Sequence, residues 1–122
     1  MKLRIRGNSI RLRLTQSEVD KIKSFNSIEE ITEFPNGQNF VYSLSATAEN
    51  NQILANFADG KIEISISKSI AETWASSDEV GIYGTHGNIQ IAVEKDFKCL
   101  TPRVGDEYTD TFPHPKEGSY DC

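Results

Sequence analysis

Hydrophobic and polar residues alternate strictly in two short segments at the start of the chain. Residues 2–6 (KLRIR) and 10–14 (IRLRL) each place apolar side chains on one face and charged side chains on the other. A period of two with one apolar face is typical of a half-buried strand. Gly7-Asn8 separates the segments, and glycine at the first turn position favours a tight type II′ hairpin. The side chains expected in the core are Leu3, Ile5, Ile10, Leu12 and Leu14.

The spacing of apolar residues changes after this hairpin. Thr15 and Glu18 stand three apart, as in a capping box, where each side chain satisfies a free backbone N–H at the start of a helix. Val19, Ile22 and Phe25 then follow at helical spacing. The pattern predicts a short helix of about ten residues that docks by this apolar face.

The rest of the chain repeats this succession of elements. A second hairpin is expected over 28–34 and 39–46, with Asn36-Gly37 in a type I′ turn, followed by a polar linker. Further strands are predicted at 52–57 and 62–66 around Asp59-Gly60, and at 79–83 and 89–93 around Gly87-Asn88. A second helix is predicted between these hairpins, from the capping residue Ser67 through Ser76, with Trp74 on its apolar face.

The order strand, strand, helix, strand, strand thus occurs twice. At an offset of 52 residues, Ile10 aligns with Ile62 and Thr15 with Ser67. We interpret this as a duplicated ββαββ unit; the alternative is a coincidental alternation of strands and helices.

The predicted fold is α+β and mostly antiparallel β, with the two units forming a pseudo-two-fold barrel or sandwich. A single domain is expected over 1–122, with units at 1–48 and 52–95 and an irregular, extended tail at 96–122. The tail holds three of the four prolines. A chain of 122 residues is long enough to bury a core of this kind.

Charge is distributed very unevenly along the sequence. The net charge is -5, yet the first 14 residues carry five cations and no acid, while the other 108 carry a net charge of -10. Such asymmetry is typical of a surface for nucleic acid or an acidic partner, and also of internal pairing between a basic hairpin and acidic segments. The candidate binding residues are Lys2, Arg4, Arg6, Arg11 and Arg13.

Two stretches resemble the swapped-hairpin transcription factors of the AbrB and MazE type. GNSIRLRLTQSEV at 7–19 and ISISKSIAETWASSDEV at 64–80 are similar to their hairpin-helix-strand unit. The resemblance implies a barrel of two interlaced units, here in tandem within one chain, and DNA contacts through Arg4, Arg6, Arg11 and Arg13.

A second resemblance covers nearly the whole chain. MKLRIRGNSIRLRL, SIAETWASSDEVGIYG, VEKDFKCL and DTFPHP are similar to a family of short bacterial proteins of unknown function. This resemblance implies a bacterial, soluble protein and no particular activity.

The basic hairpin therefore has competing interpretations. Its counterpart in the second unit carries Asn56, Glu63 and Ser65 at the outward positions, so a two-fold DNA footprint would be half missing. The negative net charge also repels phosphate. We expect a non-catalytic interaction or regulatory module with a protein partner; the alternative is a DNA-binding regulator that uses the hairpin.

Catalytic and metal-binding patterns are sparse. GxSxG, GxxxxGK(S/T), GxGxxG and HExxH are absent, so an enzyme is not the expected class and no cofactor is predicted. Cys99, His114 and Cys122 could form a thiol- or metal-dependent site in the tail, which is a third functional hypothesis. Their spacing matches no compact zinc-finger pattern, so the preferred prediction is a tail without a bound metal.

The expected location is the cytoplasm. No apolar run approaches the roughly 18 residues that a membrane span needs, and the basic N-terminus is not followed by the apolar stretch of a secretory signal. A monomer is expected, because a covalent pseudo-dimer needs no second chain.

Overall fold

The computed structural model describes residues 1–49 and 51–97, which form eight strands and two helices. The order strand, strand, helix, strand, strand occurs twice, so the α+β class and the two ββαββ successions are confirmed. The first succession comprises β1 (Lys2–Arg6), β2 (Ser9–Leu14), α1 (Gln16–Phe25), β3 (Ser27–Glu33) and β4 (Asn39–Ala48). The second comprises β5 (Ile53–Ala58), β6 (Lys61–Ser67), α2 (Lys68–Ala75), β7 (Gly81–His86) and β8 (Ile89–Lys95).

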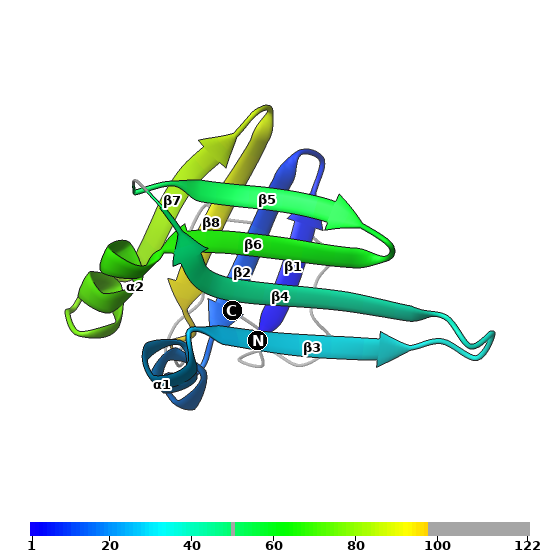
Figure 1. Cartoon of the computed structure of the whole chain (residues 1–122), viewed down its shortest axis with the longest axis horizontal. Helices are drawn as coiled ribbons and strands as arrows, with labels where there is room; N and C mark the ends of the chain where they lie inside the picture. The colour runs from blue at the N-terminus through cyan, green and yellow to red at the C-terminus, as the bar shows by residue number, and fades with distance from the viewer. Residues whose placement is uncertain (50, 98–122) are drawn as a thin grey trace, which may run out of the picture.

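The described strands form two four-stranded sheets that cross one another (Figure 1). Sheet A has the order β1-β2-β8-β7, and sheet B has the order β3-β4-β6-β5. Within them the four hairpins pair antiparallel, as the turns predict. The two central pairs, β2–β8 and β4–β6, are parallel, which the alternation did not predict. Each sheet therefore takes one hairpin from each half of the chain, and neither half builds a sheet alone.

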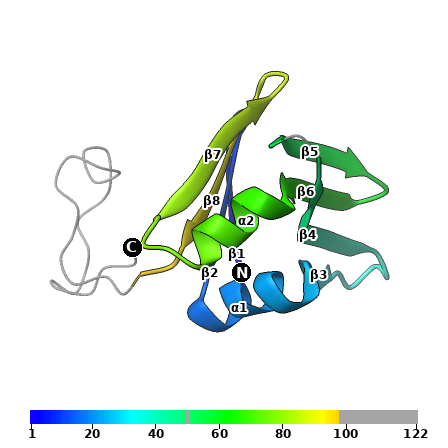
Figure 2. The ribbon, with the colours of Figure 1, turned by 60° about the vertical axis from the view of Figure 1, so that its left-hand side comes forward.

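The core lies between the inner faces of the two sheets. Figure 2 shows the sheets splayed apart, with both helices at one end of them. Leu12, Leu44 and Ile64 are completely buried on the facing strands, and each such side chain contributes about 1.5–3 kcal/mol to folding. Trp74 of α2 is also completely buried, and its indole N–H donates to the carbonyl of Val80 at 3.3 Å. This tryptophan is thus part of the core, as its helix face predicted.

Most of the local signals act as predicted. Gly7 has a φ of +53°, the positive value that the first position of a type II′ turn needs. Glu18 accepts a hydrogen bond from the Thr15 N–H at 2.9 Å, and Ser67 Oγ accepts one from Ile70 N at 3.2 Å, so both helices begin at the predicted caps.

The turn between β3 and β4 differs from the prediction. Glu33 pairs with Asn39, so the connection has five residues instead of the two of a type I′ turn. Of Asn36 and Gly37, only Gly37 has a positive φ, at +85°, whereas type I′ needs a positive φ at both. The connection closes through a hydrogen bond of 3.0 Å from Gly37 N to the carbonyl of Phe34.

Two predicted core residues are exposed. Phe25 lies at the end of α1 with 73% of its surface accessible. The buried residues of this helix are Val19 and Ile22. Ile5 is 51% exposed because it stands on the edge strand β1, one residue before the end of that strand. There it borders an apolar hollow of about 330 Å³, together with Phe57 and the inner face of β6 at Ile62.

The edge strands β5 and β7 join the two sheets along one side. His86 Nδ1 lies 3.0 Å from both the N–H and the carbonyl oxygen of Ala55. Gly84 packs directly against Ile53, and a Cβ at this position would lie 2.3 Å from Ile53 Cγ2. The absence of a side chain at Gly84 therefore permits the close approach of these strands.

Candidate functional site

The five predicted cations lie on one face of sheet A. The register pairs Lys2 with Arg13 and Arg4 with Arg11 across β1 and β2, while the opposite face of β2 carries the buried Leu12 and Leu14. All of the candidate binding residues therefore point away from the core, as the alternation predicted. We call this surface, formed by the outward side chains of β1, β2, β8 and β7, the outer face of sheet A. Lys2, Arg4 and Arg6 on the edge strand are exposed, whereas Arg11 and Arg13 are half-buried.

Glu94 of β8 and Asp96, which follows this strand, partly neutralise these cations. Glu94 Oε1 lies 3.1 Å from Arg11 Nε and 3.6 Å from Arg13 Nε. This oxygen accepts no hydrogen bond from the described residues, so both contacts are ion pairs without hydrogen-bond geometry. Lys2 Nζ lies 3.1 Å from Asp96 Oδ2. Because cross-strand like charges repel, Glu94 and Asp96 stabilise this arrangement. Among the described residues, the five cations together with Glu94 and the neighbouring Asp96 give the outer face of sheet A a net charge of about +3.

The centre of this face is hollow. Ala92 separates Arg11 from Tyr83 in one row across the sheet, and its small side chain leaves a depression of about 400 Å³. Ser9 and Gln90 line the same depression. It thus combines a guanidinium, an aromatic ring, a hydroxyl and an amide. Such a set can bind a carboxylate side chain through charge-assisted hydrogen bonds.

Tyr83 and Glu94 are tied together at the border of the hollow. The Tyr83 hydroxyl donates to Glu94 Oε2 at 2.7 Å, although 61% of the tyrosine is exposed. Glu94 is 14% exposed and contacts β2 through one oxygen and β7 through the other. It therefore holds together three adjacent strands of the face.

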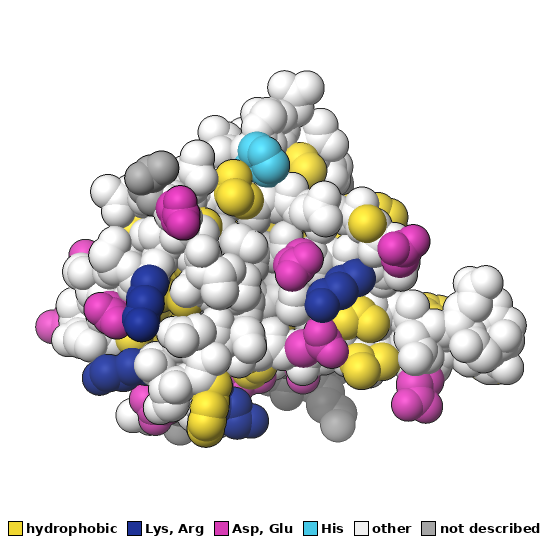
Figure 3. Space-filling model, viewed as in Figure 1, with side chains coloured by type: hydrophobic (Ala, Val, Ile, Leu, Met, Phe, Trp, Pro, Cys, Tyr) yellow, Lys and Arg dark blue, Asp and Glu magenta, His cyan; other side chains and the backbone are white. Residues whose placement is uncertain are grey.

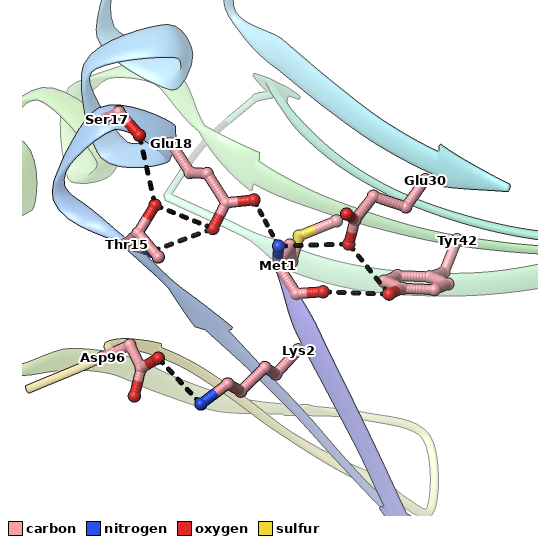
Figure 4. A network of polar contacts seen from close by, with 8 residues as sticks. All are labelled: Met1, Lys2, Thr15, Ser17, Glu18, Glu30, Tyr42 and Asp96. Atoms are coloured by element: carbon pink, nitrogen blue, oxygen red, sulfur yellow. Dashed lines mark hydrogen bonds and ion pairs between the residues drawn. The ribbon is translucent and has the colours of Figure 1, made fainter. Parts of the chain in front are cut away.

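The chain's first residue anchors the start of β1 (Figure 4). The Met1 ammonium pairs with Glu18 of α1 and, at 3.0 Å, with Glu30 of β3. The Tyr42 hydroxyl contacts both the Met1 carbonyl oxygen, at 2.9 Å, and Glu30, at 2.8 Å. Since Lys2 and Arg4 follow immediately, this network sets the position of the basic edge strand relative to sheet B.

The network perturbs the ionisation of its members. Burial alone would lower the pKa of the Met1 ammonium, but the hydrogen bonds and charges of Glu18 and Glu30 outweigh burial and raise it. Burial likewise opposes ionisation of Glu18, yet the bonds from the ammonium and from the Thr15 N–H hold its pKa below the ordinary value. Burial, followed by the adjacent Glu30 carboxylate, raises the pKa of Tyr42 to about 12.

The outer face of sheet B is different in charge. Figure 3 presents this face, where acidic and basic side chains are interspersed. Lys61 Nζ lies 3.0 Å from Glu29 Oε2, and Glu63 stands two residues further along β6. Sheet B therefore lacks the net positive charge of sheet A among the described residues.

The thiol- or metal-dependent site predicted in the tail lies outside the described residues. Cys99, His114 and Cys122 lie beyond the described residues, so the proposed thiol or metal site stays a prediction. Within residues 1–49 and 51–97, no three His, Cys, Asp or Glu side chains come together in a way that could hold a metal ion.

Sequence reasoning missed Tyr83, Glu94 and the hollow at Ala92. The alternation in β8 does place Ala92 and Glu94 on the side opposite the buried Ile91 and Val93. However, only the parallel pairing of β8 with β2 brings Glu94 beside the arginines, and no local pattern encodes that pairing.

The chain belongs to a family of unknown function (DUF7009), whose sequence pattern matches residues 1–116. No curated protein and no solved structure matches it. In the part of the chain that the structure describes, neither helix has the length and apolar character to cross a membrane.

Proposed function

We propose that this protein is a non-catalytic interaction module that binds an acidic segment of a partner protein on the outer face of sheet A. The observation that carries the proposal is the hollow at Ala92, bordered by Arg11 on a face with a net charge of about +3. Carboxylates of an extended peptide would meet Arg4 and Arg6 at the exposed edge and Arg11 in the hollow. Tyr83 offers an aromatic surface beside them.

A protein partner fits this face better than duplex DNA does. Glu94 stands in the middle of the cations and would face the phosphates of a bound duplex. Duplex binding requires several phosphate contacts, and Glu94 and Asp96 stand among the cations that would make them. An acidic peptide needs fewer contacts, and its side chains can avoid Glu94.

We place this module in the bacterial cytoplasm as a monomer. The tandem duplication and the AbrB-type ancestry remain predictions. The interleaving of the two halves supports both, because hairpins exchanged between halves are what a fused pair of interlaced units would contain.

A binding measurement tests the proposal. A short fluorescein-labelled peptide of alternating glutamate and serine is titrated with the full chain, and the anisotropy is recorded at low salt. We expect Arg4→Ala with Arg6→Ala to weaken binding about tenfold, because two exposed charge-assisted contacts are lost. Lys21→Ala with Lys23→Ala, on the exposed side of α1, removes the same charge elsewhere and is expected to change little.

Two results would contradict the proposal. The first is equal weakening by the two double variants, since binding would then follow net charge alone. The second is tighter binding of a short DNA duplex than of the peptide, lost on Arg4→Ala with Arg6→Ala, which would assign the face to nucleic acid.

A further inference from the structure

We propose that the chain's own segment 98–122 docks onto the outer face of sheet A and competes there with the acidic partner. This inference rests on the proposed function, because it concerns the regulation of the same face. It starts from the place where the described chain ends. Asp96 N donates to the Leu14 carbonyl at 2.7 Å, and the Asp96 carboxylate pairs with Lys2, so the last described residues include one that lies beside the basic hairpin.

The segment is long enough to reach the centre of the face. Ala92, in the row of Arg4, Arg11 and Tyr83, lies five residues before Phe97 along β8, a distance of about 17 Å. Asp106 lies nine residues after Phe97, and an extended chain of that length spans up to about 30 Å. The length of the segment is therefore sufficient for Asp106 to reach this row.

The charges of the segment and the face are complementary. Residues 98–122 contain five acids and three cations, and three of the acids fall within five residues, at Asp106, Glu107 and Asp110. The outer face of sheet A carries a net charge of about +3 among the described residues, whereas sheet B carries Glu29 and the half-buried Glu63 around Lys61. Among the two described sheet faces, sheet A is therefore the one that attracts the segment.

Covalent attachment makes even a weak contact effective. A segment joined to the face through a short connection acts at an effective concentration in the millimolar range. An acidic partner must displace the segment. The partner's apparent affinity is therefore its intrinsic affinity multiplied by the fraction of molecules in which the face is free. The segment would thus set a threshold for partner binding.

The experiment neutralises the acids of the segment in the full chain. The variant Asp106→Asn, Glu107→Gln, Asp110→Asn is compared with Glu72→Gln, Asp78→Asn, Glu79→Gln, which removes three negative charges from exposed positions at α2 and the turn after it. Two quantities are measured: the affinity of the labelled glutamate-serine peptide, and the amide NMR shifts of Arg4, Arg11 and Ala92.

We expect the segment variant to bind the peptide about threefold to tenfold more tightly than the wild-type chain, and the α2 variant to bind nearly as the wild type does. We also expect the amide shifts of the outer face of sheet A to change in the segment variant alone, independently of protein concentration. Unchanged shifts would overturn the inference, whatever the affinities. Shifts that depend on protein concentration would also overturn it, because the segment would then act between copies.

The two readouts separate this inference from the proposed function. If the shifts change but the peptide binds no variant, the segment occupies the face and the proposed function fails. If the peptide binds both variants and the wild type equally and the shifts are unchanged, the proposed function stands and the inference fails.

Discussion

Glu94 gives the sharpest test of how the basic face is held together. Its carboxylate lies between Arg11 and Arg13 on one side and the Tyr83 hydroxyl on the other. Glu94→Gln removes the negative charge and keeps an oxygen that accepts the tyrosine hydrogen bond. The arginines then repel one another without compensation. We therefore expect the variant to be less stable and, because the face gains one positive charge, to bind the acidic peptide more tightly.

The magnitude follows from the geometry of the two ion pairs. Their separations are 3.1 and 3.6 Å, the Arg11 side chain is 36% exposed and the Arg13 side chain 13%. Solvent screens such pairs, so each contributes about 0.5–1 kcal/mol and together they contribute about 1–2 kcal/mol to the free energy of unfolding. Peptide affinity is expected to rise about threefold at low salt.

Urea unfolding measures the first quantity, with the fluorescence of the single tryptophan as the signal. A loss of this size lowers the midpoint by roughly 0.5–1 M urea. At about 1 M salt the Debye length is roughly 3 Å, so the difference between variant and wild type shrinks. Glu72→Gln, at an exposed position of α2, is the matched control and is expected to leave the midpoint unchanged.

An unchanged or raised midpoint for Glu94→Gln at low salt would refute this reasoning. It would mean that the desolvation of Glu94 offsets its attraction to the two arginines. A loss of stability that persists at high salt would refute the electrostatic origin of the effect.

Other perturbations test the elements that position this face. Glu18→Gln is expected to lower the free energy of unfolding by about 2 kcal/mol, because it removes the main partner of the buried Met1 ammonium. Glu18 has a lowered pKa, so its contribution is present above its ordinary pKa of 4.5 and is lost as pH falls through the lowered value. The Met1 ammonium has a raised pKa, so its contribution is complete below 8.0 and is lost as pH rises through the raised value. The free energy of unfolding of the wild type and of Glu18→Gln is therefore measured as a function of pH. The difference between the two proteins should be largest at about pH 5–8, and a difference that does not change with pH would contradict the assignment. Gly84→Ala is expected to destabilise the protein by about 1–3 kcal/mol through a clash with Ile53. In an Ile53→Ala background the loss should be smaller, and equal losses in thermal unfolding would show that the two residues are not coupled.

The residues that confirm the sequence prediction are those whose signal is local. Gly7 and the Asp59-Gly60 pair adopt the positive φ values that their tight turns require, and Glu18 and Ser67 cap the helices. Turns, caps and periodicity depend on neighbours within a few positions, so most of them can be read without knowing the fold; the exception is the Asn36-Gly37 turn, whose connection is longer than predicted. Ile5 and Phe25 were wrongly assigned to the core because periodicity gives the apolar face and not the extent of the element that covers it.

The sequence by itself determined the eight strands, the two helices and the common face of Lys2, Arg4, Arg6, Arg11 and Arg13. Only the tertiary structure decided which hairpins share a sheet. The parallel pairing of β2 with β8 joins residues about 80 positions apart, and such contacts depend on the packing of the whole core. That pairing places Glu94 beside Arg11, and Ala92 between Arg11 and Tyr83. It therefore turns a basic hairpin into a hollowed, partly neutralised face.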